Sequence, residues 1–291
     1  MGIGGAELDR PQINYRPTAA ERWPEVRNWP GARVLITGGS SGIGLATARL
    51  LTGRGASVVI AARRADVLHS AAQELGPSVR TAVVDVTDRA RVRGVVDELT
   101  EHGSSPFDVV VMSAGDARPG HFMDLDHDVF RSMMEVNYFG TLNTIQATVP
   151  AMLERRSGSI VAVSSVAGIL GVFGYTAYSP AKFAVRGLMQ SLRDELTPHG
   201  IHVGCVFPPD VDTPMLLQEA RFKPAETAAL SGTIRPLPPE QVARAVVRGI
   251  ERRRFAIYPD RSTGLLAATS APLAPIFRAY FDRQIARARR T

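Results

Sequence analysis

Six short apolar runs recur along the sequence, and segments with helical periodicity alternate with them. The runs are RVLIT (33–37), SVVIAA (57–62), RTAVVDV (80–86), FDVVVMSAG (107–115), GSIVAVSS (158–165) and IHVGCVFPP (201–209). Strands that read as near-continuous apolar runs are typical of sheets buried on both faces, and the intervening helices supply the covering layers. The pattern therefore predicts an α/β fold, a single domain built on a doubly wound parallel sheet.

The same pattern predicts how the chain is divided. Residues 1–30 are polar with several prolines, so we expect an N-terminal arm there. Residues 31–260 are expected to form the α/β domain, with a lid at about 209–237, and residues 261–291 a basic C-terminal tail or helix. The sequence contains no internal repeat and no break that would separate a second domain.

The composition indicates the cellular compartment in which the protein is expected. The chain of 291 residues has one cysteine, Cys205, which excludes an internal disulfide and favours a reducing compartment. No apolar run reaches the ~18 residues needed to span a bilayer, and the first thirty residues lack a secretory signal pattern. We therefore expect a cytoplasmic protein.

The net charge of +6 raises the question of an anionic partner. Only two of the 34 basic residues are lysines, and the arginines are spread along the chain, so we expect no nucleic-acid partner. They are denser only after GLLAATSAPLAPIF (264–277), at Arg278, Arg283, Arg287, Arg289 and Arg290. Two interpretations stay open for this tail: peripheral contact with an anionic membrane, or a docked helix with a solvated basic face.

A glycine-rich loop, TGGSSGIG (37–44), follows the first predicted strand and opens the first predicted helix. Glycines there let a phosphate approach the backbone, and the helix N-terminus offers unpaired N–H groups. The spacing is Gly38-x3-Gly42-x-Gly44, and glycines also make ordinary turns, so the position within the strand–helix unit carries the interpretation. We expect a dinucleotide to contact Gly38, Ser40, Ser41, Gly42, Ile43 and Gly44.

The end of the second strand bears on cofactor choice. An acidic residue there would repel a 2′-phosphate, whereas this chain has Arg63 and Arg64, whose planar guanidinium groups suit phosphate. The sequence thus favours NADP(H), although both arginines are also compatible with a plain surface role. Asp85, at the end of the third strand, is a candidate for the adenine edge or for a helix N-cap.

The segment SSVAGILGVFGYTAYSPAK (164–182) carries the candidate chemistry. Tyr178 and Lys182 are four residues apart and share a helix face, and Ser165 ends the preceding strand. A nearby ammonium favours the phenolate, so Lys182 is expected to lower the pKa of Tyr178 and let it exchange a proton with a carbonyl or alcohol oxygen. The alternative is a packed aromatic beside a solvated lysine.

Taken together, TGGSSGIG, SAG (113–115), Asn137 in EVNYFG, Ser165 and YSPAK resemble the short-chain dehydrogenase/reductases over about 31–260. The resemblance implies a Rossmann-like domain with a seven-stranded parallel sheet, a homodimer or homotetramer, and a catalytic tetrad of Asn137, Ser165, Tyr178 and Lys182. In the family the lysine also holds the nicotinamide ribose, and the asparagine orders a water in a proton relay. The remaining expected cofactor contacts are Val86, Ala114, Gly115, Pro208, Val211 and Thr213.

The chain departs from the family pattern at two places. Met112-Ser113-Ala114-Gly115 stands where the family usually has Asn-Asn-Ala-Gly. Pro208-Pro209 stands where it usually has Pro-Gly. Only local cofactor contacts are affected, because the first glycine-rich turn is intact.

The second departure is similar to one subgroup of the family. FPPDVDTP (207–214), FKPAET (222–227), PPEQVA (238–243) and GILGVFGYTAYSPAKFAVRGL (168–188) resemble the 3-ketodihydrosphingosine reductases. This resemblance implies NADPH-dependent reduction of the 3-keto group of a long-chain sphingoid precursor, although this chain has Val67 where that subgroup tends to place a lysine beside the 2′-phosphate. The expected substrate pocket comprises Ser165, Tyr175, Met215 and Leu216.

Two alternatives remain for the function. One is a reductase or dehydrogenase of 3-oxoacyl thioesters, steroids or other hydrophobic ketones. The other is a non-catalytic protein that binds the cofactor as a sensor, for which an intact tetrad would have little use.

Overall fold

The fold is given by a computed structural model, which describes residues 29–100, 106–231 and 235–290. Seven parallel strands form one sheet in the order β3-β2-β1-β4-β5-β6-β7. The strands are β1 (Arg33–Thr37), β2 (Ser57–Ala62), β3 (Arg80–Val83), β4 (Val109–Met112), β5 (Gly158–Val163), β6 (Ile201–Val206) and β7 (Ala256–Ile257). The predicted α/β class and doubly wound parallel sheet are confirmed. The predicted N-terminal arm lies outside the described residues except for its last two.

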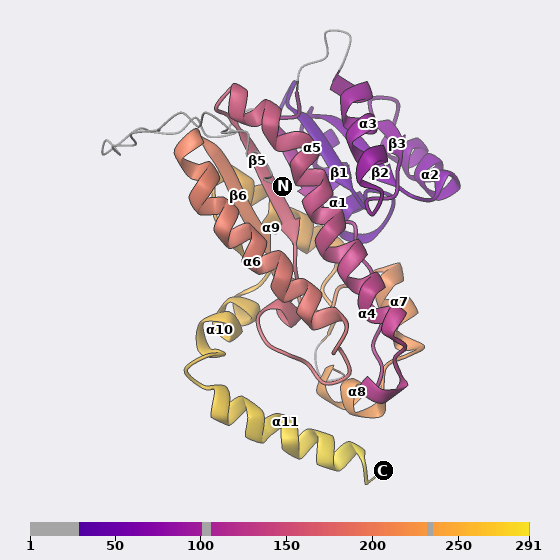
Figure 1. Ribbon diagram of the computed structural model, residues 1–291, viewed down its shortest axis with the longest axis vertical. Coiled ribbons are helices and arrows are strands. Elements are labelled where there is room, and N and C mark those ends of the chain that lie inside the picture. Colours follow the sequence, from indigo (N-terminus) through magenta and orange to yellow (C-terminus); the bar gives the residue numbers. More distant parts are fainter. Residues whose placement is uncertain (1–28, 101–105, 232–234, 291) are drawn as a thin grey trace, which may run out of the picture.

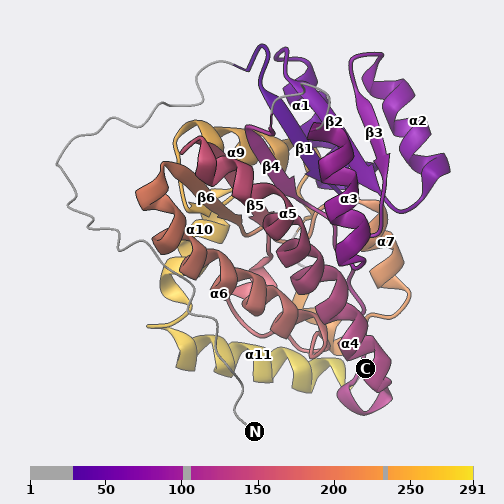
Figure 2. The ribbon, with the colours of Figure 1, turned by 45° about the horizontal axis from the view of Figure 1, so that its top comes forward.

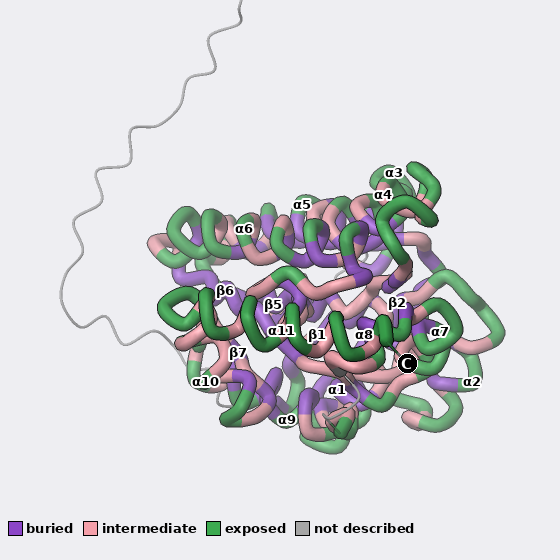
Figure 3. Tube along the Cα trace, turned by 90° about the horizontal axis from the view of Figure 1, so that it is seen from below, coloured by how far each residue is buried: buried purple, intermediate pink, exposed green. Residues whose placement is uncertain are grey.

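Helices cover both faces of the sheet (Figures 2 and 3). One layer contains α3 (Arg89–Thr100), α5 (Gly140–Glu154) and α6 (Tyr178–Leu196), and the other contains α1 (Gly42–Thr52), α2 (Ala65–Leu75) and α9 (Pro239–Glu251). Successive strand residues point to opposite layers, so Leu35 packs in one core cluster and Val34 and Ile36 in the other. All three are at most 2% exposed. Full burial of one such side chain stabilises the fold by about 1.5–3 kcal/mol.

The segment before β5 is helical from His127 to Glu154, but the type of helix changes within it. It is divided into α4 (His127–Met134), one π-helical turn (Glu135–Phe139) and α5. The extra residue of a π turn shifts the side chains that follow it, and such turns are frequent at functional sites. Here the turn carries Asn137.

The carboxyl ends of the strands are covered by two segments that follow the last long strand. Helices α7 (Pro214–Ala220) and α8 (Ala225–Ser231) lie within the predicted lid, and α10 (Arg261–Thr269) and α11 (Ala274–Ala288) make up most of the predicted C-terminal segment. Helix α11 runs across the base of the molecule and packs against α8 (Figures 1 and 3). Within the described parts of the chain, no helix is both long enough and apolar enough to cross a bilayer.

Candidate active site

A cavity of about 510 Å³ opens at the carboxyl ends of the central strands, beneath α7 and α11. The strand order reverses between β1 and β4, and ligands of open α/β sheets bind in the crevice at such a switch point. Of the residues expected to contact a cofactor or substrate, all line the cavity except Gly44. Of the predicted catalytic tetrad, Ser165, Tyr178 and Lys182 line it, whereas Asn137 lies outside the lining.

The glycine-rich loop forms a close backbone cradle between β1 and α1. Gly38 has φ +67°, and a Cβ there would lie 2.6 Å from the Ala114 nitrogen. A Cβ on Gly44 would lie 2.2 Å from the Gly38 carbonyl oxygen. The absence of a side chain at Gly44 therefore lets α1 pack closely on the loop, and Gly44 itself does not line the cavity. Ser41 precedes α1 without a side-chain cap bond to the described residues, which leaves the helix N-terminus open to an anion.

Arginine side chains reach the rim of the cavity beyond β2. Arg63 and Arg64 both line it, and Arg63 Nη1 lies 3.8 Å from Asp85 Oδ2. Asp85 Oδ1 accepts hydrogen bonds from the Thr87 amide and hydroxyl, at 2.9 and 2.8 Å. The N-cap alternative is wrong for Asp85, because Asp88 directly precedes α3 and accepts from the Arg91 amide at 2.9 Å.

Both segments that depart from the family pattern contribute residues to the cavity lining. Ser113 lines it, and its amide donates to the Thr37 carbonyl at 3.1 Å. Pro208 and Pro209 line it as well, and the Pro208 carbonyl accepts from the Val166 amide at 2.9 Å. Both segments are held by backbone hydrogen bonds, which are independent of the side chain.

Ser165, Tyr178 and Lys182 meet where β5 gives way to α6. Ser165 caps a short 3₁₀ turn, Tyr178 is the first residue of α6, and Lys182 follows one turn later. Lys182 Nζ lies 5.5 Å from the centre of the Tyr178 ring and donates to the Val163 carbonyl at 3.0 Å. Lys182 is buried, so the alternative of a solvated lysine is wrong.

The electrostatics of Tyr178 differ from the expectation. Burial raises the pKa of Tyr178, the Glu219 carboxylate raises it further, and a hydrogen bond with Ser165 lowers it in part. Burial also lowers the pKa of Lys182 to about 8. The net shift is therefore opposite to the expected lowering, and the environment holds Tyr178 as a neutral phenol. A neutral phenol is the form that donates a proton.

Asn137 sits behind the cavity wall, in the π-helical turn, and is 1% exposed. Its Nδ2 donates to the carbonyls of Asp116 and Met133, both at 2.9 Å. A Cβ on Gly115 would lie 2.8 Å from Asn137 Oδ1 and 3.4 Å from Lys182 Nζ. Asn137 therefore holds the loop after β4 close to Lys182.

One side of the cavity is apolar. Tyr175, Met215 and Leu216, predicted for the substrate pocket, line it. They are joined by residues that the sequence did not indicate: Leu170, Val172, Leu230, Leu266, Phe277, Tyr280 and Phe281. Leu217, by contrast, is exposed, and Phe222 stacks under Arg118 at 3.2 Å from ring centre to guanidinium carbon. Of the apolar residues in α7, only Met215 and Leu216 face the cavity.

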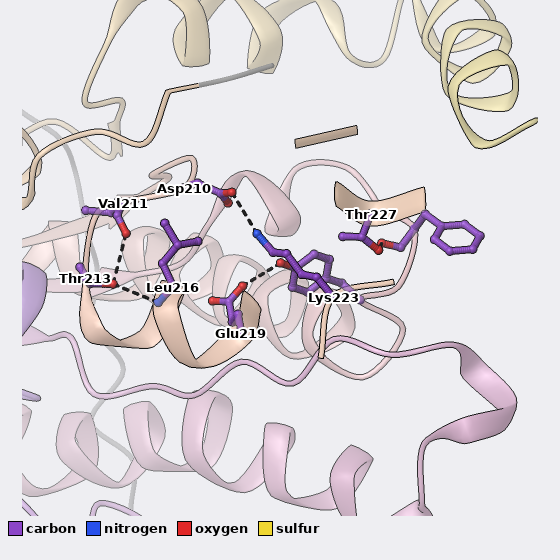
Figure 4. A network of polar contacts seen from close by, with 9 residues as sticks. Asp210, Val211, Thr213, Leu216, Glu219, Lys223 and Thr227 are labelled. Carbon is purple, nitrogen blue, oxygen red and sulfur yellow. Dashed lines mark hydrogen bonds and ion pairs between the residues drawn. The ribbon is translucent and has the colours of Figure 1, made fainter. Parts of the chain in front are cut away.

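This wall also contains a buried carboxylate that the sequence pattern did not indicate. Glu219 of α7 lines the cavity, and its Oε2 accepts a hydrogen bond from the Tyr175 hydroxyl at 2.7 Å (Figure 4). Burial raises the pKa of Glu219. The available signal was its spacing of three residues from Leu216, which places both on one helix face.

Comparison with known proteins gives consistent matches. The family model described as short chain dehydrogenase matches residues 32–223. The chain is 38% identical to the 3-ketodihydrosphingosine reductase of Bos taurus, with 85% of this chain and 76% of the relative covered. It is 39% identical to the 3-dehydrosphinganine reductase of Danio rerio, with 84% and 76% covered.

The chain is also similar to a solved structure. The short-chain dehydrogenase from Sphingobium yanoikuyae in complex with NADPH superimposes with a TM-score of 0.71 at 26% identity. The match covers 84% of this chain and 94% of that one.

Proposed function

Since the chain belongs to the short-chain dehydrogenase family and is thus an oxidoreductase, we propose that it reduces the 3-keto group of a long-chain sphingoid base with NADPH. The observation that carries this proposal is the convergence of Ser165, Tyr178 and Lys182 on a cavity with a phosphate cradle at one side and an apolar wall at the other. The apolar wall supports a long-chain substrate, as does the similarity to relatives named as sphingoid reductases.

The cavity fits NADPH at the positions where the backbone and charges can be tested. Only glycine fits at Gly38, where a Cβ would collide with the Ser113–Ala114 backbone, and the open N-terminus of α1 follows this loop and suits a phosphate. Arg63 and Arg64 would hold the 2′-phosphate, and Asp85 and Val86 would lie along the adenine. When bound, the reduced nicotinamide supplies the hydride that the carbonyl carbon requires.

Residues of the protein itself would carry out the proton transfer. Tyr178, held as a phenol, would give its proton to the carbonyl oxygen and is the proposed general acid. Ser165 would hydrogen-bond the same oxygen and fix its direction. Lys182 would hold the nicotinamide ribose and stabilise the phenolate that remains after transfer, while Asn137 would position the loop beside it.

The test is NADPH oxidation, followed by absorbance, with 3-ketodihydrosphingosine in detergent micelles. Wild type should turn over, and Tyr178→Phe should lose at least about 100-fold in kcat because it lacks the acid, while its affinity for NADPH changes little. Strong turnover by Tyr178→Phe would contradict the mechanism.

A second candidate substrate class is tested in the same assay. The apolar wall also fits 3-oxoacyl thioesters, steroids and other hydrophobic ketones. If wild type binds NADPH and reduces one of these but not the sphingoid ketone, the substrate proposal fails and the reaction class stands. Binding of NADPH without turnover of any carbonyl would favour a sensor.

We further propose that the protein is cytoplasmic and contacts membranes through α10 and α11. Leu265 and Ile276 are 66% and 64% exposed on these helices, and arginines follow them at Arg278 and Arg283. Apolar and basic residues together suit an anionic bilayer surface. Sedimentation with phosphatidylserine vesicles should carry wild type down, and Leu265→Ser with Ile276→Ser should reduce this.

A homodimer or homotetramer is proposed from the family resemblance. Phe183 on α6 is 40% exposed and offers an apolar contact. Light scattering should give two or four times the mass of the 291-residue chain.

A further inference from the structure

The side chain of Glu219 stands next to the proposed acid. Glu219 is 8% exposed, and Tyr175, which donates to it at 2.7 Å, is buried too. The ring centres of Tyr175 and Tyr178 lie 5.6 Å apart. The carboxylate therefore lies in the cavity wall one side chain away from the phenol that would protonate the carbonyl oxygen.

This end of the cavity has an excess of negative charge. Asp116, Asp210 and Glu219 all raise the pKa of Tyr178, so the three carboxylates act on the same space. Lys223 Nζ pairs with Asp210 at 3.2 Å, although its charge also lowers the pKa of Glu219, and Lys182 Nζ donates to the Val163 carbonyl. In the described part of the chain, no basic side chain lies within 4.0 Å of the Glu219 oxygens. A buried carboxylate is costly unless it is paired, so Glu219 is suited to receive a cation from a ligand.

We propose that Glu219 binds an ammonium group on the carbon next to the substrate ketone, and so selects 2-amino ketones over plain ketones of equal length. The inference rests on the proposed function and deepens it. An amino nitrogen on the adjacent carbon must lie within a few ångströms of the carbonyl oxygen, and the Tyr175–Glu219 pair lies beside Tyr178. An ammonium–carboxylate hydrogen bond is stronger than a neutral one.

Tyr175 acts as a positioning residue in this arrangement. Its hydroxyl fixes the direction of the carboxylate, and its hydrogen bond lowers the pKa of Glu219 against the opposing effect of burial. The Tyr175 hydrogen bond thus offsets part of the effect of burial, which still raises the pKa of Glu219 overall.

The first test compares two substrates in wild type and in Glu219→Gln. The substrates are 3-ketodihydrosphingosine and the same-length 1-hydroxy-3-ketone without the amino group. Wild type should prefer the amino ketone in kcat/KM, and Glu219→Gln should reduce that preference about 10- to 100-fold, chiefly through KM. Glutamine still accepts from Tyr175, so the wall keeps its shape. Glu240→Gln removes the same charge from α9 at a residue outside the cavity lining and should keep the wild-type preference.

The outcomes distinguish the proposed role of Glu219 from the proposed function of the protein. If wild type reduces the amino ketone and Glu219→Gln keeps the same preference, the role of Glu219 is overturned and the proposed function stands. If wild type reduces neither substrate while binding NADPH, both are overturned.

A second variant, Tyr175→Phe, provides a pH profile as readout. Loss of the hydrogen bond raises the pKa of Glu219, so the acidic limb of kcat/KM for the amino ketone should move to higher pH. A peptide α-amino group, also next to a carbonyl, has a pKa of about 7.7–8.0, so we expect the substrate's amino group to stay charged along that limb. Asp116, Asp210, Lys182, Lys223 and Tyr178 face both substrates alike, so a shift seen equally with the plain ketone would overturn the assignment to Glu219.

Discussion

Lys182 shows how one buried charge can serve the site at the expense of stability. It is 5% exposed, and burial lowers its pKa from 10.5 in the unfolded chain to about 8. Below pH 8 both states hold the proton, and folding must bury the charge. Between pH 8 and 10.5 the folded protein releases the proton while the unfolded chain keeps it, so stability rises with pH.

We therefore predict that the free energy of unfolding of wild type, relative to Lys182→Met, rises by about 3 kcal/mol between pH 7.5 and pH 10.5. Urea unfolding of both proteins without cofactor measures it. At pH 7.5 the variant should be the more stable protein although it is inactive. A difference that does not change with pH would show that the folded Lys182 has an ordinary pKa.

At the same scale, the sequence identifies some site residues and not others. Ser165, Tyr178 and Lys182 were predictable because their spacing within one strand–helix unit has few other uses. Glu219 was not, because a glutamate on a short helix usually faces solvent. Its burial depends on Tyr175, 44 positions earlier, and on the packing of α7 over the cavity.

At the scale of elements, the glycine-rich loop has a steric requirement that can be tested with a matched pair. Gly38 has positive φ and no room for a Cβ, whereas a Cβ on Gly94, inside α3, meets nothing within 4 Å. Gly38→Ala should destabilise by about 1–3 kcal/mol and abolish NADPH binding, since both strain and clash fall on the cradle.

Gly94→Ala should stabilise by about 0.5–1 kcal/mol and leave binding unchanged, because alanine is the better helix former. Urea unfolding and NADPH fluorescence titration measure both variants. Normal NADPH binding by Gly38→Ala would contradict the cradle.

The element limits were predicted best for the first two strands. The runs at 33–37 and 57–62 match β1 and β2, whereas four runs extend past their strands by two or three residues. The residues predicted beyond the strand ends include Asp85, Ser113, Ser165 and Pro208, which lie outside the sheet and line the cavity. Strand β7 spans two residues, too short to produce periodicity, and was expected only from the family resemblance.

At the scale of the whole molecule, the C-terminal helix returns to the site that the preceding domain builds. Phe277, Tyr280 and Phe281 of α11 line the cavity although they lie about 100 residues after Tyr178. Sequence pattern left this segment open as a membrane-contacting tail or a docked helix, because an amphipathic pattern does not identify the surface that it covers. The aromatic residues at the cavity support docking, and the exposed Leu265 and Ile276 leave a second face for a membrane.

The aromatic residues of α11 should therefore affect the preference for substrate chain length and not the reaction at the carbonyl. We predict that Phe277→Ala with Phe281→Ala lowers kcat/KM for an 18-carbon ketone at least about tenfold, because two aromatic contacts to the chain are lost. A 6-carbon ketone should depend little on these contacts, so we expect it to be reduced at close to the wild-type rate. Ile276→Ala, at an exposed position outside the cavity lining, is the matched control and should change neither value in detergent. An equal loss for both ketones would mean that α11 supports the fold of the site and does not hold the substrate chain.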